Sequence, residues 1–188
     1  MKSTEVYKTI HRIVGPWCRQ NGFKRAKSGW LAYQKPWGSK QLAFWFQCNK
    51  WGWDKYSGSS FTVEFQLHES QELGQLSNRR FQEFLTAEEL EYVRARQNKI
   101  ISRIPSSPRD WTEAFESNAR RLYKNSEEII AGFRMSWAPI EQPYRPNHDI
   151  WLRYWQEEDV LAWTIFIASI LPRVIKQITT ESRTIGCT

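Results

Sequence analysis

The chain has 188 residues, of which 40% are hydrophobic and 28 are aromatic, including 11 tryptophans. This aromatic content excludes a disordered protein, and the length fits one domain that buries a core without metal or disulfide staples. The longest apolar run, Val160 to Leu171, has twelve residues against the about 20 that a bilayer span needs, so we predict no membrane partner. The opening residues hold no apolar signal core and the three cysteines cannot all pair, which favours a reduced, cytoplasmic protein.

The net charge of +7 is concentrated towards the N-terminus. Residues 1–60 hold eleven lysines and arginines and two acids, whereas the other 128 residues hold 16 basic and 18 acidic side chains. The positive electrostatic field of this N-terminal region favours an anionic partner: a nucleic acid, an acidic protein or a membrane surface. The alternative is internal: the acidic C-terminal half docks against the basic N-terminal half.

The first predicted element is an amphipathic helix capped by Ser3 or Thr4. We expect a kink at Gly15-Pro16, because proline removes one intrahelical hydrogen bond, and an end at Asn21-Gly22, because glycine accepts the left-handed conformation. The apolar residues at spacings of three and four are Val6, Tyr7, Ile10, Ile13, Val14, Trp17 and Cys18.

Three strands are predicted next, at 27–35, 41–49 and 60–68, with a turn over 36–39. The third alternates cleanly between apolar and polar residues. Short connections make these strands an antiparallel meander with one face packed and one face partly wet. We interpret Cys18 on the helix and Cys48 in the second strand as small buried hydrophobic residues, and not as zinc ligands or disulfide partners.

The remainder of the chain is predicted to be helical. Thr86 and Glu89 form a capping box at the start of one helix. Asp110 opens a second helix, which is broken near Asn125-Ser126.

A last, strongly apolar helix is expected from about Ile150 to Thr179, with Asp149 as its cap and Pro172 bending or dividing it. This helix is either central to the core or one half of a dimer interface. The predicted fold class is α+β: an N-terminal helix, a three-stranded or slightly larger antiparallel sheet, and C-terminal helices packed to close the core. One domain spans 1–188, with the helix and antiparallel meander in 1–68 and the helical part in 79–180.

Several short motifs resemble those of the bacterial family known as domain of unknown function 4304. The similarity is best over the first 68 residues and loose over the last 30. It implies the same α+β fold and brings no catalytic residues to this chain. The motifs are Asn21-Gly22-Phe23-Lys24-Arg25, Trp30-Leu31-Ala32-Tyr33, Phe46-Gln47 with Lys50-Trp51, Phe61-Thr62-Val63 and Ile170-Leu171-Pro172.

No residue pattern predicts catalysis. Asp54 followed by Glu64 loosely resembles the carboxylate pair of metal-dependent nucleases, but Gln66 stands where those enzymes have lysine. The three histidines fall on a helix, a strand end and a loop, and no nucleophile elbow or phosphate-binding loop accompanies them. We therefore predict no catalytic residues, no metal and no cofactor.

The strongest signal is a segment in which aromatic and basic residues alternate, between positions 35 and 56. Aromatic faces beside cations suit protein hot spots and also the stacking of single-stranded bases. The alternative is a structural cover, in which the same residues fold back onto the sheet. The candidate binding residues are Trp37, Lys50, Trp51, Trp53, Lys55 and Tyr56.

These observations predict a non-enzymatic macromolecule-binding domain whose partner is a protein, with an accessory or immunity-type role in bacteria. Single-stranded nucleic acid or RNA is the alternative partner, and a metal-dependent nuclease-like hydrolase is a more distant one. A homodimer is compatible with either kind of binding.

Overall fold

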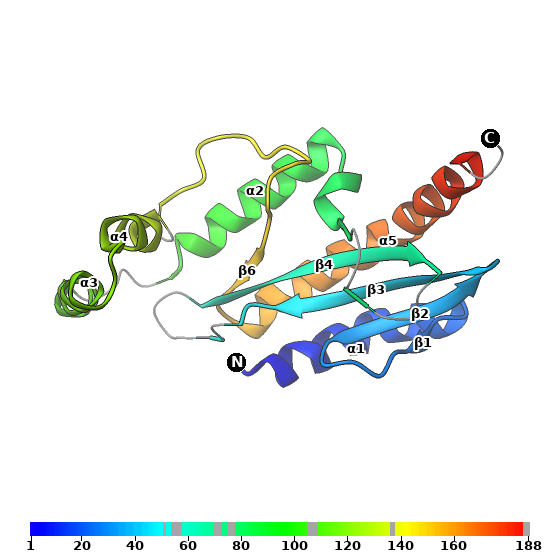
Figure 1. Cartoon of the computed structure of the whole chain (residues 1–188), viewed down its shortest axis with the longest axis horizontal. Helices are drawn as coiled ribbons and strands as arrows, with labels where there is room; N and C mark the ends of the chain where they lie inside the picture. The colour runs from blue at the N-terminus through cyan, green and yellow to red at the C-terminus, as the bar shows by residue number, and fades with distance from the viewer. Residues whose placement is uncertain are drawn as a thin grey trace.

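The computed structural model describes residues 1–50, 52–53, 58–69, 73–74, 78–104, 109–135 and 138–185. Six strands form one antiparallel sheet, and helices precede and follow it, which confirms the predicted α+β class (Figure 1). The elements are α1 (Ser3–Gln20), β1 (Lys24–Arg25), β2 (Leu31–Trp37), β3 (Lys40–Cys48), β4 (Ser59–His68), β5 (Arg79–Arg80), the 3-10 helix η1 (Phe81–Phe84), α2 (Ala87–Ile101), α3 (Arg109–Leu122), α4 (Ser126–Met135), β6 (Leu152–Tyr154) and α5 (Glu157–Ile185).

Helix α1 follows the predicted amphipathic pattern and begins at Ser3, so that Lys2, not Ser3 or Thr4, is its cap residue. The Glu5 carboxylate accepts a 2.6 Å hydrogen bond from the Lys2 backbone N–H and so satisfies a donor at the helix start. The helix continues through Pro16 to Gln20. Gly22, with φ of +77°, ends it as predicted.

The second and third strands form a hairpin with a tighter turn than predicted. Trp37 pairs with Lys40, so the turn itself is Gly38-Ser39, and the positive φ of +60° at Gly38 suits a two-residue hairpin loop. Strand β2 begins at Leu31 instead of residue 27. Pro36 fits within β2 because β1 pairs only with residues 33 and 34, which leaves β2 as an edge at Pro36.

The sheet order is β1-β2-β3-β4-β5, and β6 pairs with β4 on the same side as β5. Successive residues of β4 face opposite sides of the sheet, as predicted. The prediction that the polar side of this strand is partly exposed to water is wrong. Thr62, Glu64 and Gln66 are buried along with their apolar neighbours. Loops cover them: the backbone N–H of Gly74 donates to Gln66 Oε1 at 3.1 Å, and the Asn78 amide donates to Glu64 Oε2 at 3.2 Å.

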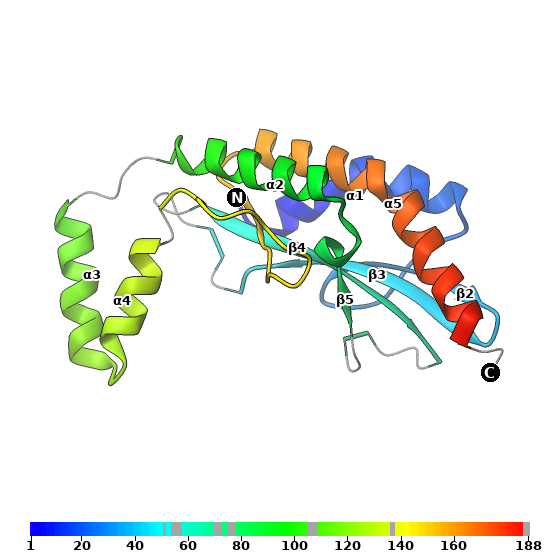
Figure 2. The ribbon, with the colours of Figure 1, turned by 90° about the horizontal axis from the view of Figure 1, so that it is seen from above.

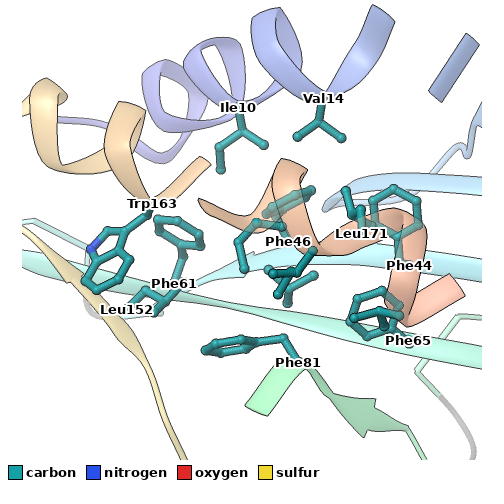
Figure 3. Packing of buried hydrophobic residues seen from close by; sticks show 14 of the residues in the cluster. Ile10, Val14, Phe44, Phe46, Phe61, Phe65, Phe81, Leu152, Trp163 and Leu171 are labelled. Carbon is teal, nitrogen blue, oxygen red and sulfur yellow. The ribbon is translucent and has the colours of Figure 1, made fainter. Parts of the chain in front are cut away.

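Helices α1, α2 and α5 lie over one face of the sheet, and the main core fills the space between the two layers (Figure 2). Phe44 and Phe65 stack across β3 and β4 with ring centroids 5.9 Å apart. Figure 3 shows Ile10 and Val14 of α1 pointing towards these strands, with Trp163 and Leu171 on α5. Burial of such large side chains is the main source of stability in a domain of this size.

Helices α3 and α4 pack against each other as a hairpin set apart from the helical layer (Figure 2). Ala119 and Ile130 are buried, whereas Leu122 and Tyr123 near the tip are exposed. The predicted break at residues 125–126 is confirmed, because α4 begins at Ser126.

The end of the chain corrects two predictions. Residues 152–154 form strand β6, and the last helix starts only at Glu157 and passes through Pro172 without dividing. Asp149 is not its cap, since its carboxylate pairs with Arg80. Asp159, the third residue of the helix, instead satisfies the donors before the helix start: its Oδ2 accepts from the backbone N–H groups of Trp155 and Gln156 at 3.0 and 3.1 Å.

Candidate functional site

The predicted binding residues divide between the two ends of strand β3. Trp37 lies at the hairpin turn, where it is partly buried against the core. Lys50 and Trp53 follow the other end, about 26 Å away along a nine-residue strand. Trp51, Lys55 and Tyr56 lie outside the described residues. Among the three predicted residues that the structure describes, Trp37 is therefore separated from Lys50 and Trp53.

Lys50 and Trp53 meet the start of α1 around a hollow of about 540 Å³. The end of strand β3 forms one wall of the hollow. The first turn of α1 forms a second wall, and Tyr154 of β6 forms a third. Segments more than 100 residues apart in sequence thus border the same space. The lining residues are Met1, Lys2, Ser3, Thr4, Tyr7, Gly29, Cys48, Asn49, Lys50, Gly52, Trp53 and Tyr154.

Trp53 is both exposed and tethered. Its side chain is 36% exposed, and its indole Nε1 donates a 3.1 Å hydrogen bond to the backbone carbonyl of Trp155. The indole is therefore held by one edge at the corner between β6 and α5. Because the ring is already held in place, less conformational entropy is lost when a partner binds to it.

Tyr7 and Cys48 form the floor of the hollow. The Tyr7 hydroxyl accepts a hydrogen bond from the Cys48 backbone N–H at 3.4 Å. Burial raises the pKa of Tyr7, and burial raises the pKa of the Cys48 thiol to about 11. A thiol with this pKa is almost wholly protonated at neutral pH and so is a poor nucleophile. The hollow offers surfaces for binding: cationic Lys2 and Lys50 at the rim, and aromatic edges inside.

The basic N-terminal half is only lightly neutralised by the C-terminal half. Between described side chains, one ion pair joins a basic residue of 1–60 to an acid beyond it, namely Arg12 with Glu157 at 3.7 Å. Thr9 donates to the same carboxylate at 3.0 Å. Among the described side chains, this carboxylate of α5 is therefore where an acid of the C-terminal part meets a base of α1. Most of the N-terminal positive charge faces outward.

Apart from the partly buried Trp37, the aromatic residues of strands β2, β3 and β4 are buried. Trp45 is fully buried beneath Trp30, with the rings stacked at 5.8 Å, and Tyr33, Phe44 and Phe46 face the helices. A flat sheet that binds single-stranded nucleic acid needs such rings exposed for base stacking. In the part of the sheet that the structure describes, Tyr33, Phe44 and Phe46 pack in the main core, and Trp45 packs with Ala26, Ala32 and Trp30 in a second, smaller cluster.

The described residues considered for catalysis have separate partners and positions. Glu64 contacts Arg80 at 3.4 Å and Asn78, and Asp54 is outside the described residues. His11 bonds Tyr33, while His68 ends β4 and His148 lies before β6. Among the residues that the structure covers, no group of three His, Cys, Asp or Glu side chains is arranged to hold a metal ion.

The sequence pattern missed the contribution of α1 to the hollow. The sequence predicts Ser3 or Thr4 only as a helix cap and Tyr7 only as part of an apolar helix face, and it assigns no role to Met1 or Lys2. Their meeting with Lys50 and Trp53 depends on how α1 crosses the sheet, and no local periodicity encodes that crossing.

Comparisons of the chain with known protein families, with curated proteins and with solved structures found no match. The resemblance to domain of unknown function 4304 therefore stays a prediction. Within the described ranges, none of the helices combines the length and the apolarity required to cross a membrane.

Proposed function

We propose that this chain is a non-enzymatic, cytoplasmic protein-binding domain that binds its partner at the hollow around Trp53. One observation carries the proposal: Lys50 and Trp53, chosen from sequence as binding residues, border the same hollow as the start of α1. Exposed large aromatics beside a hollow are typical anchors of protein interfaces.

The charge around the hollow indicates the chemistry of the partner. Lys2 and Lys50 are both exposed at its rim, and the surrounding N-terminal half is strongly basic. An acidic segment that inserts one apolar or aromatic side chain beside Trp53 would satisfy both features. The basic field would speed its approach, and the buried aromatic contact would slow its release.

Nucleic acid is the weaker candidate partner, because the charge of the surface favours it but the burial of the sheet aromatics does not. The outward positive charge suits a phosphate backbone, yet the sheet aromatics that would stack bases are buried. Among the described aromatic residues that line the hollow, Trp53 is the exposed one, whereas single-strand binders use successive aromatic platforms.

A peptide-display selection against the wild-type protein tests the proposal. We expect acidic sequences with an apolar or aromatic anchor, whose affinity falls about tenfold or more in Trp53→Ala and in Lys50→Glu. Trp37→Ala and Lys40→Glu are the matched controls, because they lie at the opposite end of β3 and should retain binding.

Two outcomes would contradict the proposal. One is a selection that yields no ligand sensitive to Trp53, while a single-stranded oligonucleotide binds with an affinity that falls steeply with salt. The other is loss of binding in Trp37→Ala with retention in Trp53→Ala, which would move the binding surface to the hairpin turn.

A further inference from the structure

A second hollow, of about 840 Å³, adjoins the hollow around Trp53. Gly29, in the loop before β2, lines both, so the two hollows meet at this residue. Figure 2 shows the helices on one side of the sheet and the loop before β2 on the other. A ligand that leaves the Trp53 hollow over Gly29 therefore passes from the helical side towards the second face of the sheet. This Trp30 hollow is also lined by Arg25, Lys27, Ser28, Trp30, Gln34 and Leu73.

Trp30 is partly exposed and is held in place by three contacts. Its ring stacks on the ring of the fully buried Trp45, with centroids 5.8 Å apart. The Ser28 hydroxyl accepts from the Trp30 backbone N–H at 3.2 Å and donates to the Trp30 carbonyl at 3.0 Å. Gly74 lies against the ring edge, where a Cβ would come within 3.2 Å of it. The exposed part of the ring is thus fixed before a partner binds, which reduces the entropy lost on binding.

The charge of the Trp30 hollow is positive. The side chains of Arg25 and Lys27 are exposed, and no described carboxylate lies within ion-pair distance of either. Lys2 and Lys50 line the adjoining Trp53 hollow. Among the described residues, no aspartate or glutamate lines either hollow. Two adjoining hollows of the same sign favour one anionic chain that spans both.

We propose that the acidic polypeptide segment bound at the Trp53 hollow continues over Gly29 and occupies the Trp30 hollow as well. This inference rests on the proposed function, because it extends the contact with the same partner. The Arg25 guanidinium suits a carboxylate, which it can bind through two N–H groups. Leu73 and the exposed part of Trp30 offer contact to a second apolar or aromatic side chain. Gly29 leaves room for the crossing, since a Cβ there would meet no described atom within 4 Å.

A polypeptide fits this pair of hollows better than a nucleic acid does. Single-strand binders stack successive bases on neighbouring aromatic faces. Trp30 and Trp53 line separate hollows, and Trp45 covers one face of Trp30. An extended peptide, in contrast, can place separate side chains in separate pockets along its length.

Two synthetic acidic peptides test the inference. The single peptide is acetylated Glu-Glu-Trp-Glu-Glu amide, and the tandem peptide joins two such units through a short glycine linker. The readout is the indole N–H signals of Trp30 and Trp53 in the folded, ¹⁵N-labelled protein, assigned with the Trp30→Phe and Trp53→Phe variants. We expect the tandem peptide to shift both signals and to bind at least about tenfold more tightly than the single peptide, because filling the second hollow becomes intramolecular.

Charge variants identify the second contact. Lys27→Glu should weaken binding of the tandem peptide about tenfold and leave the response of Trp53 to the single peptide unchanged. Arg25→Glu is the second variant, with the same expected result. Lys24→Glu is the matched control, because Lys24 is exposed beside Arg25 on β1 and lines neither hollow, so both affinities should stay nearly constant.

A substitution at the junction tests the crossing itself. Gly29 does not have a positive φ and has open space around its Cβ position, so Gly29→Glu adds a carboxylate without backbone strain. This variant should abolish the affinity advantage of the tandem peptide. Gly29→Ser, which adds a small neutral side chain, should keep it.

The outcomes that overturn the inference differ in what they mean for the proposed function. A shift of the Trp53 signal alone, with equal affinities for the two peptides, removes the second contact and leaves the proposed function standing. So does a tandem affinity that neither Lys27→Glu nor Arg25→Glu lowers. A shift of the Trp30 signal alone, or no shift with about 1 mM of either peptide, contradicts both. Shifts caused by single-stranded oligothymidylate and by neither peptide contradict both and assign the surface to nucleic acid.

Discussion

The imidazole Nδ1 of His11 lies 2.6 Å from the phenolic oxygen of Tyr33, and the two rings are within 12° of parallel. This hydrogen bond joins α1 to β2. The Arg25 guanidinium lies 5.9 Å from the centre of the Tyr33 ring. Burial lowers the pKa of His11, and the positive charges of Arg25 and Arg19 lower it further.

His11 should therefore make stability depend on pH. Its pKa is 6.5 in the unfolded chain and lower in the fold, so the unfolded chain binds the proton more readily. The stabilisation is fully present above pH 6.5 and is lost as pH falls from 6.5 through the lowered pKa. Melting curves between about pH 7.5 and pH 5 should show this loss in the wild type and a smaller one in His11→Gln. His68→Gln is the matched control, and parallel pH profiles for wild type and His11→Gln would disprove the effect.

Gly15→Ala should lower stability, although alanine normally favours a helix. A Cβ at Gly15 would lie 2.8 Å from Cε1 of His11, so the imidazole would have to move and its bond to Tyr33 would weaken. We expect a loss of about 1 kcal/mol in the wild type and a gain of about 1 kcal/mol in a His11→Ala background. A double-mutant cycle by denaturant unfolding measures this sign change, and additive effects would contradict it.

Gly58→Ala should be far more damaging than Gly52→Ala. Both glycines have positive φ, +67° and +76°, so both substitutions strain the backbone. Only at Gly58 would the new Cβ collide with the Tyr154 carbonyl oxygen, whereas no described atom lies within 4 Å at Gly52. We expect about 1 kcal/mol for Gly52→Ala and more than about 3 kcal/mol for Gly58→Ala in chemical denaturation. Equal losses would mean that Gly58 does not approach β6 this closely.

Trp53→Ala should cost little stability in the free protein. The substitution removes one hydrogen bond and a partly exposed ring, worth about 1 kcal/mol or a few degrees in Tm. Trp163→Ala is the buried comparison, since Trp163 is fully buried and its loss should cost about 3–5 kcal/mol. If thermal melting shows equal losses, Trp53 is a structural cover and the proposed binding surface loses its anchor.

The two described cysteines should differ in reactivity. Cys18 is fully buried, and burial raises its pKa to about 12, whereas Cys48 is partly exposed at the hollow. A thiol reagent at neutral pH should modify Cys48 slowly and Cys18 only after unfolding, with peptide mass spectrometry identifying the site. Cys187 lies outside the described residues, and from sequence we predict rapid labelling there. Labelling of Cys18 at a similar rate would show that α1 does not bury it.

Local patterns in the sequence predicted the elements whose causes are local. The 3.6-residue periodicity of α1, the capping box at Thr86 and the alternation of β4 each depend on neighbours within a few positions. For the same reason the α+β class and the buried side of the meander were predictable.

Tertiary structure decided whatever depends on distant segments. Glu64 alternates as a solvent-facing residue would, yet Asn78 and Arg80 cover and neutralise it. Residues 152–154 lack a strong strand pattern and become β6 because the open edge of β4 offers backbone hydrogen-bond partners. The Trp53 hollow exists because β3, β6 and the start of α1 converge on one point. Side-chain periodicity reports which way a residue faces on its own element, and only the packing of the elements decides what lies opposite it.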